Sequence, residues 1–140
     1  MMNKIFIDTS FIIPIFKKND KSRLIIEKNK DILFENECYI SNGVLNEVIT
    51  VVMMKTKNIK LTEKAYYFLN DNFNIINEFE IEKYNDRVFT LFKKYNEKNY
   101  KASFIDCSSI IIVNNLDLDY VVSLDKFFNK FKEIELLKLE

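Results

Sequence analysis

Short apolar runs alternate with longer amphipathic stretches along this chain of 140 residues. The short runs have the length and the aromatic or β-branched content of buried strands. They predict strands at residues 4–8, 38–40, 73–76 and 120–122, and a fifth, at a sheet edge, at 134–139. The longer stretches have helical spacing and follow polar residues that can cap a helix. They predict helices at residues 11–16, 23–30, 42–57, 62–69, 81–95 and 104–116.

This alternation predicts an α/β fold: a mostly parallel sheet of four or five strands with helices on both faces. Three hydroxyl residues mark helix starts, namely Ser10, Ser41 and Ser103, and the stretch 20–22 opens the helix at 23–30. Residues 55–60 and 95–101 are expected to be polar loops within one domain that spans residues 1–140. No repeat, low-complexity tract or linker interrupts the pattern.

Composition narrows the possible chemistry. The chain has no histidine, which excludes Ser-His-Asp and Cys-His mechanisms and nuclease chemistry based on paired histidines. Its one glycine, Gly43, lies in a predicted helix start, which argues against a phosphate-binding glycine loop. Two thiols without histidine do not make a zinc site, so Cys38 and Cys107 are expected to be reduced core residues.

Charge and hydropathy narrow the location and the partners. The formal net charge is zero, which argues against a sequence-independent nucleic-acid coat but allows a basic rim around an acidic centre. The apolar runs are too short to cross a bilayer, and the N-terminus lacks a signal-peptide pattern. We therefore expect a cytoplasmic protein that does not interact with membranes.

Two acids follow predicted strands. Asp8 ends the strand at 4–8, and Asp125 follows the strand at 120–122. Parallel strands have their carboxyl ends at one edge of the sheet, where ligands of open α/β folds bind. Each acid can also simply cap the helix that follows it.

Two further acids lie on predicted helices. On a helical wheel, Glu47 falls between Val51 and Met54, at the edge of the apolar stripe, where an unpaired carboxylate is costly to bury. Asp106 lies in a helix that is apolar nearly all round, although an acid there also suits the helix dipole. Four carboxylates at one point would repel one another, and a divalent cation removes that penalty. An all-oxygen site suits Mg²⁺ or Mn²⁺, and phosphodiester hydrolysis is the natural reaction.

These acids stand in segments that resemble the motifs of the PIN-domain family, in particular the VapC-like toxins of type II toxin–antitoxin pairs. The four segments, in order, are Ile5-Phe6-Ile7-Asp8-Thr9-Ser10, Ile40 to Val48 around Glu47, Phe104 to Ile110 around Asp106, and Val122 to Phe128 around Asp125. Their order and spacing fit over nearly the whole chain. Ser123 stands where many members of the family have threonine.

The resemblance implies a Rossmann-like three-layer α/β/α sandwich and an Mg²⁺- or Mn²⁺-dependent endoribonuclease. Asp8, Glu47, Asp106 and Asp125 would be its catalytic acids, and Ser10 and Ser123 would support them or hold ligand waters. The expected scheme has Asp8, Asp106 and Asp125 as metal ligands, while Glu47 positions or deprotonates the attacking water. The family also implies a homodimer and a cognate antitoxin that blocks the acidic pocket.

Three alternatives stay open at this point. One is a PIN nuclease of RNA processing or decay that has no antitoxin. Another is a catalytically inactive PIN-like interaction module. The third is a phosphoryl-transfer or receiver-like domain with an acidic Mg²⁺ pocket. Lys126 is a candidate contact to the RNA backbone, or a solvated surface residue.

Overall fold

A parallel sheet lies at the centre of the computed structural model, which describes residues 2–17 and 21–140. Within these residues the sheet has four strands: β1 (Lys4–Ile7), β2 (Glu37–Ser41), β3 (Asn74–Ile76) and β4 (Tyr120–Val122). The strand order is β3-β2-β1-β4, and every neighbouring pair is parallel. The carboxyl ends of β1 and β4 are therefore adjacent, as the two acids that follow these strands require.

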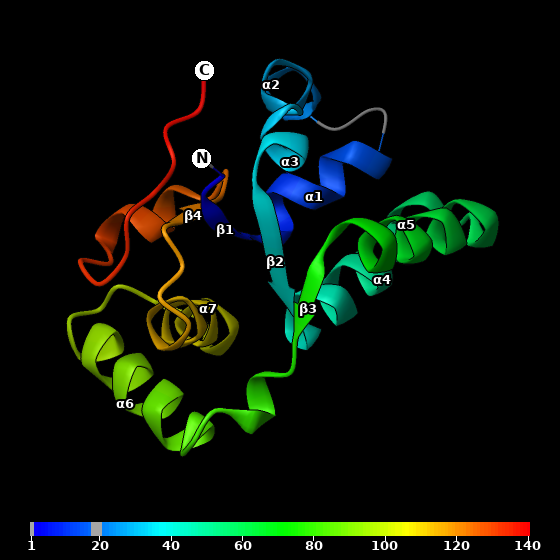
Figure 1. Cartoon of the computed structure of the whole chain (residues 1–140). Helices are drawn as coiled ribbons and strands as arrows, with labels where there is room; N and C mark the ends of the chain where they lie inside the picture. Colours follow the sequence, from blue (N-terminus) through cyan, green and yellow to red (C-terminus); the bar gives the residue numbers. More distant parts are fainter. Residues whose placement is uncertain (1, 18–20) are drawn as a thin grey trace.

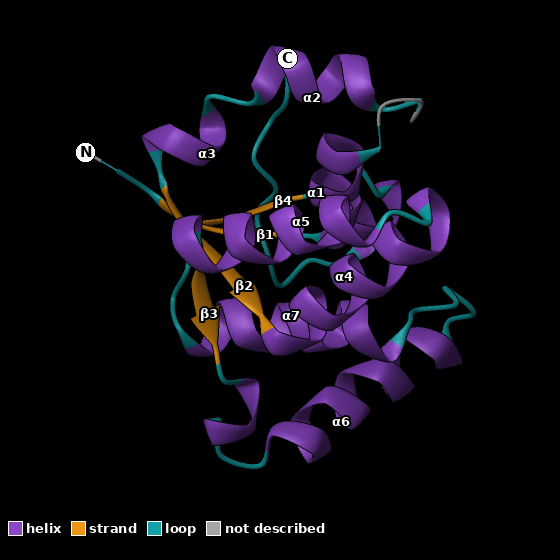
Figure 2. Cartoon of the chain, turned by 90° about the vertical axis from the view of Figure 1, so that its right-hand side faces the viewer, coloured by secondary structure: helices purple, strands orange, loops and turns teal. Residues whose placement is uncertain are grey.

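Helices cover both faces of this sheet. The chain order of the helices is α1 (Thr9–Phe16), α2 (Arg23–Asn29), α3 (Ile32–Glu35), α4 (Asn42–Thr56), α5 (Ile59–Asn72), α6 (Tyr84–Glu97) and α7 (Phe104–Asn115). Two short 3₁₀-helices follow β3 and β4, namely η1 (Glu78–Glu80) and η2 (Lys126–Lys130). Helices α1, α4 and α5 lie on one side of the sheet and α6 and α7 on the other (Figures 1 and 2). The expected α/β fold with a parallel sheet between helical layers is confirmed.

The order in which the chain forms the four strands explains why helices lie on both faces of the sheet. From β1 to β3 the chain moves one way across the sheet, and from β3 it returns past β2 and β1 to β4. Right-handed crossovers in opposite directions place their helices on opposite faces. Helices α6 and α7 belong to the return crossover, so Asp106 on α7 approaches the sheet from the face opposite to α4 and its Glu47.

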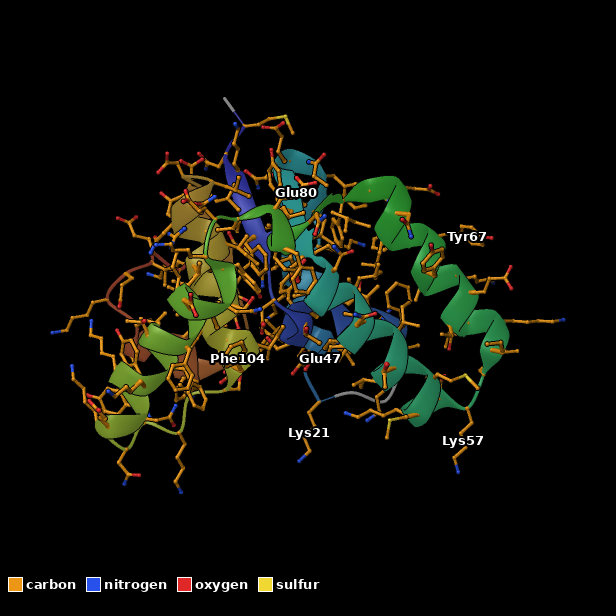
Figure 3. The ribbon with its side chains drawn as sticks, turned by 90° about the horizontal axis from the view of Figure 1, so that it is seen from below. Lys21, Glu47, Lys57, Tyr67, Glu80 and Phe104 are labelled. Carbon is orange, nitrogen blue, oxygen red and sulfur yellow. The ribbon has the colours of Figure 1, made fainter. Side chains whose placement is uncertain are left out.

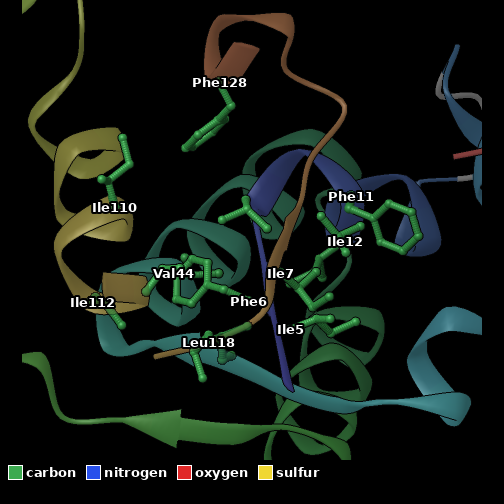
Figure 4. Close-up of a cluster of buried hydrophobic side chains, with 14 of the residues drawn as sticks. Ile5, Phe6, Ile7, Phe11, Ile12, Val44, Ile110, Ile112, Leu118 and Phe128 are labelled. Atoms are coloured by element: carbon green, nitrogen blue, oxygen red, sulfur yellow. The ribbon is translucent and has the colours of Figure 1, made fainter. Parts of the chain in front are cut away.

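The core lies between these layers (Figure 4). Strand β1 is its centre, because Ile5, Phe6 and Ile7 are all fully buried between the two helical layers. Phe11 and Ile12 of α1 and several residues of the other helices, Val44, Ile110, Ile112 and Phe128, complete the buried cluster. A strand buried on both faces reads as a continuous apolar run, which is why residues 5–7 are apolar without alternation.

Two of the three expected hydroxyl caps are present. Ser41 Oγ accepts from the Val44 N–H at 3.1 Å, and Ser103 Oγ accepts from the Asp106 N–H at 3.0 Å. At α1 the capping residue is Asp8 rather than Ser10, since the helix begins at Thr9. Cys38 and Cys107 are buried free thiols, and burial raises the pKa of each to about 12.

Other boundaries differ from the expectation. Helix α5 begins at Ile59 rather than Thr62, because Asn58 is its cap and accepts from the Leu61 N–H at 3.0 Å. The expected loop at 55–60 is thus only the two residues between α4 and α5. Helix α6 extends two residues into the expected loop at 95–101. It starts at Tyr84 rather than residue 81, because Lys83 before it is left-handed, with φ of 54°.

Two further predictions, for residues 134–139 and for Asp20, are not confirmed in full. The fifth strand at 134–139 is reduced to a single parallel bridge between Leu136 and Val121. Asp20, expected to open α2, lies outside the described residues. No helix in the part of the chain that the structure describes is long and apolar enough to cross a membrane.

Candidate functional site

Asp8 lies at the carboxyl end of β1 with only 8% of its surface exposed. Its backbone N–H donates to Val122 O at 2.9 Å, so the β1–β4 ladder continues up to this residue. Its Oδ2 accepts from Ser10 Oγ at 2.6 Å, from the Ser10 N–H at 3.2 Å and from Ser123 Oγ at 2.9 Å. Burial raises the pKa of the Asp8 carboxyl, and the hydroxyl donors oppose that rise only in part.

The two serines join the segment after β1 to the segment after β4. Their Oγ atoms are 3.1 Å apart, and both reach the Asp8 carboxylate. Ser10 Oγ also accepts from the Leu124 N–H at 2.9 Å, and Ser123 Oγ accepts from the Asp125 N–H at 3.0 Å. The hydroxyls thus orient one carboxylate and fix the turn that carries another. Both serines contact the acids directly, as a supporting role requires.

Asp106 lies in the first turn of α7 and is half-buried. Burial is the main cause that raises the pKa of its carboxyl to about 6, and the negative charges of Asp8 and Asp125 raise it further. The charge of Asp125 likewise raises the pKa of Asp8. The structure therefore brings these three acids within electrostatic reach of one another. We call Asp8, Asp106 and Asp125 the acidic cluster.

Asp125 is exposed at the start of η2, where its Oδ1 accepts from the Phe127 N–H at 2.9 Å. It is thus a cap, as Asp8 is for α1. The capping interpretation of these two acids is correct, and it is compatible with their proximity. Lys126, the next residue, is exposed on η2.

Glu47 does not lie where the helical wheel predicted. Helix α4 packs through Val44, Val48 and Val52, while Met54 is 70% exposed. The buried stripe is therefore centred away from the Val51–Met54 side, and Glu47 is exposed. Its side chain projects from α4 on the side that faces the start of α7, which Phe104 marks in Figure 3. No hydrogen bond or ion pair between Glu47 and the acidic cluster is present among the described residues.

A further buried carboxylate follows β3. Glu78 is only 2% exposed, and its two oxygens accept from the N–H groups of Asn42 and Gly43 at 2.9 and 2.8 Å. Sequence reasoning missed this acid. Its signal resembled the one that marked Asp8, because Glu78 comes two residues after an apolar strand, Asn74–Ile76.

The acidic cluster suits a divalent cation by the chemistry of its donors. All are carboxylate oxygens, with hydroxyls behind them, and hard cations prefer such oxygens. Neighbouring negative charges contribute to the raised pKa values of Asp8 and Asp106, and a bound cation would remove this repulsion. In the described residues, however, no three acidic, cysteine or histidine side chains converge closely enough to hold one ion. By their chemistry, the oxygens of these residues fit such an ion.

The sequence that carries these four acids can be compared directly with known protein families. A family model of the PIN domain matches residues 5–134. The chain belongs to the PIN-domain family. The match includes the acidic cluster, Glu47 and both supporting serines. No curated protein matches the sequence at a significant level.

Solved structures that resemble this PIN domain include two toxin–antitoxin proteins. VapC20 of Mycobacterium tuberculosis, described as a sarcin-ricin loop cleaving toxin, has a TM-score of 0.73 and 18% identity, and the match covers 94% of this chain and 98% of that chain. VapBC2 of Rickettsia felis, bound to a DNA fragment from their promoter, has a TM-score of 0.74 and 15% identity, over 98% and 99% of the two chains. PAE2754 of Pyrobaculum aerophilum has a TM-score of 0.57 and 13% identity, over 96% and 89%. At these identities the likeness establishes the fold.

Proposed function

We propose that this PIN domain is a metal-dependent endoribonuclease and acts as the toxin of a VapBC-type toxin–antitoxin pair. The observation that carries this proposal is the acidic cluster. Asp8, Asp106 and Asp125 gather at one edge of the sheet, where burial and mutual repulsion raise the pKa values of the first two. The caps that Asp8 and Asp125 form do not need a third acid nearby, and the repulsion among the three acids costs stability, so a functional use is the better explanation.

The residues of the acidic cluster would hold Mg²⁺ or Mn²⁺, directly or through water. When bound, such a cation polarises a phosphoryl oxygen and lowers the pKa of a bound water. Ser10 and Ser123 keep Asp8 in one orientation by donating to its Oδ2. Glu47, exposed on α4, is the residue free to position or deprotonate the water that attacks the scissile phosphate of RNA in line. The products would carry a 5′-phosphate and a 3′-hydroxyl.

The partners in this proposal follow the likeness to VapC20 and VapBC2. They are an RNA substrate, a cognate antitoxin that covers the acidic edge, and a second copy of the chain in a homodimer. The proposal places the protein in the cytoplasm, as a single domain over residues 1–140.

The test is cleavage of structured and unstructured RNA by the purified protein, with and without Mn²⁺ or Mg²⁺. We expect cleavage that EDTA abolishes and that added Mn²⁺ restores, with products that a 5′-phosphate-dependent exonuclease degrades. A protein that neither cleaves RNA nor binds Mn²⁺ in a titration would be an interaction module, and the proposal would be wrong.

A second assay separates the toxin from a nuclease of RNA processing. Expression of the chain is expected to arrest growth, and co-expression of a small protein encoded next to it is expected to relieve the arrest. Cleavage in vitro without any growth arrest would favour RNA processing or decay.

A further inference from the structure

Glu78 binds the first turn of the helix that carries Glu47. Its carboxylate accepts from the N–H groups of Asn42 and Gly43, the first two residues of α4, at 2.9 and 2.8 Å. Asn42 Nδ2 donates to Ile76 O at 3.2 Å, which ties the same turn to the end of β3. Free N–H groups and the helix dipole favour an anion at this position, so the contact holds the start of α4 firmly against η1.

Gly43 brings the first turns of α4 and α7 together. A Cβ atom at this position would lie 2.6 Å from Ile105 Cδ1 and 3.3 Å from Glu78 Oε2. Without a side chain at this position, α7 approaches α4 this closely with no shift of the end of the Ile105 side chain, and Glu78 keeps its two N–H donors. The lone glycine of the chain serves this close contact.

The two ends of this contact stand next to the proposed catalytic acids. Ile105 immediately precedes Asp106 of the acidic cluster. Glu47 is four residues after Gly43, so it lies one turn further along the same face of α4. The face that meets Ile105 thus continues into Glu47, in agreement with its direction in Figure 3.

We propose that Glu78 is a positioning residue. Together with Gly43, it sets the position of Glu47 relative to Asp106 where the first turns of α4 and α7 meet. Glu47 has no hydrogen bond or ion pair to the acidic cluster among the described residues, so its place depends on how its helix is held. The proposal rests on the proposed nuclease function and deepens it. Glu78 itself is buried against the helix and does not contact substrate.

A double-mutant cycle tests this role. Glu78→Gln keeps the shape of the side chain but replaces one acceptor by an NH₂ group that cannot receive an N–H. We expect kcat for RNA to fall about 10- to 100-fold with KM nearly unchanged, because a displacement of about 1 Å at a catalytic group costs that much. In a Glu47→Gln background, the same change should lower kcat less than about twofold further, since the residue it positions is already disabled.

The matched control is Glu80→Gln, an exposed acid on the same 3₁₀-helix. It should leave kcat at the wild-type value. All variants are compared below the lowest melting temperature, so that each is folded. Equal losses from Glu78→Gln in both backgrounds, or no loss in either, would overturn the positioning role.

A second variant, Gly43→Ala, tests the same geometry at the other residue of the proposal. The added Cβ displaces the end of the Ile105 side chain and presses on Glu78 Oε2, so we expect a loss of kcat smaller than that of Glu78→Gln. Ile105→Val removes the Cδ1 atom that the Cβ would meet, and it should restore kcat in the double variant. A folded Gly43→Ala protein with wild-type kcat would show that the contact between α4 and α7 at Gly43 does not set the position of Glu47.

A readout without turnover separates this inference from the nuclease function. Bound Mn²⁺ broadens nearby amide NMR signals, and in Glu78→Gln the broadening should weaken in α4 and stay unchanged in α1. Broadening that is identical in wild type and Glu78→Gln would overturn only the inference. Absence of both broadening and RNA cleavage in wild type would remove the nuclease function and this inference with it.

Discussion

Two buried carboxylates in this PIN domain, Asp8 and Glu78, follow parallel strands and differ in what surrounds them. Glu78 is 2% exposed and accepts from two backbone N–H groups at the start of α4. Asp8 is 8% exposed, receives two side-chain hydroxyls and one N–H, and lies within reach of the negative charge of Asp125. Both acids accept from N–H groups at a helix start, but Asp8 also adds charge close to the charge of Asp125.

The difference separates a structural acid from a functional candidate. Backbone N–H groups at a helix start stabilise an anion without any further partner, so the contact of Glu78 lowers the free energy of the fold. The acidic cluster raises that free energy until something positive binds. We therefore expect amide substitutions at the two sites to have different effects on stability, which the following measurements test.

The largest expected effect is on catalysis. Asp8→Asn and Asp106→Asn should each lower kcat/KM for RNA by at least about 100-fold, since each removes a charge that the metal and the transition state require. The measurement is RNA cleavage in Mn²⁺, with Asp71→Asn, an exposed acid of α5, as the control that keeps full activity. If both cluster variants cleave as fast as wild type, the acidic cluster is not the catalytic site.

The second effect concerns stability without metal. Glu78→Gln should lower the free energy of unfolding by about 2 kcal/mol, because a buried N–H loses its acceptor. Asp8→Asn should leave it unchanged or raise it, since asparagine also caps helices well and carries no charge to desolvate. Urea denaturation in EDTA measures both. A larger destabilisation by Asp8→Asn than by Glu78→Gln would refute the distinction between the two acids.

The same comparison shows what the sequence could and could not reveal. Asp8, Asp106 and Asp125 were found because strand ends and helix starts are local signals, and parallel strands bring their ends together. Glu78 carries the same local signal as Asp8, an acid after a short apolar strand. Its partners are backbone atoms 35 and 36 residues away, which no side-chain pattern records.

The predictions for the orientation of Glu47 and for the helix boundaries failed for related reasons. The wheel for α4 ranked Met54 with the buried residues, but its side chain is 70% exposed, because only tertiary packing decides which apolar residues are covered. Helix α5 begins before Thr62 because Asn58, which is also a good capping residue, accepts from the Leu61 N–H. Strand β4, in contrast, matched at both ends, since a short apolar run between polar residues leaves little choice.

A smaller effect follows from the raised pKa of Asp106, to about 6. Its unfolded value is near 3.8, so between about pH 4 and pH 6 the folded state binds more protons than the unfolded state. The folded protein therefore loses stability as pH rises through this window. Partial exposure limits the contribution to about 1 kcal/mol.

Asp106→Asn removes this loss. The difference in unfolding free energy between the variant and wild type should grow from near zero at pH 4 to its full value above pH 6, in metal-free buffer. Carboxyls outside the acidic cluster titrate in both proteins and cancel in the difference. Saturating Mn²⁺ should reverse the order of stability, because only wild type has the full set of ligands. A pH-independent difference would mean that neither burial nor the other two acids raise the pKa of Asp106.

The smallest expected effect is at Ser123, whose hydroxyl donates to Asp8 and accepts from the Asp125 N–H. Ser123→Ala should cost about 1 kcal/mol of stability and lower the Mn²⁺ affinity modestly, because outer hydrogen bonds orient metal ligands. Ser123→Thr keeps the hydroxyl at a half-buried position and should retain both. Calorimetric Mn²⁺ titration of the two variants decides the point. If alanine and threonine bind Mn²⁺ with equal affinity, the serine only shapes the turn after β4 and does not orient Asp8 for the metal.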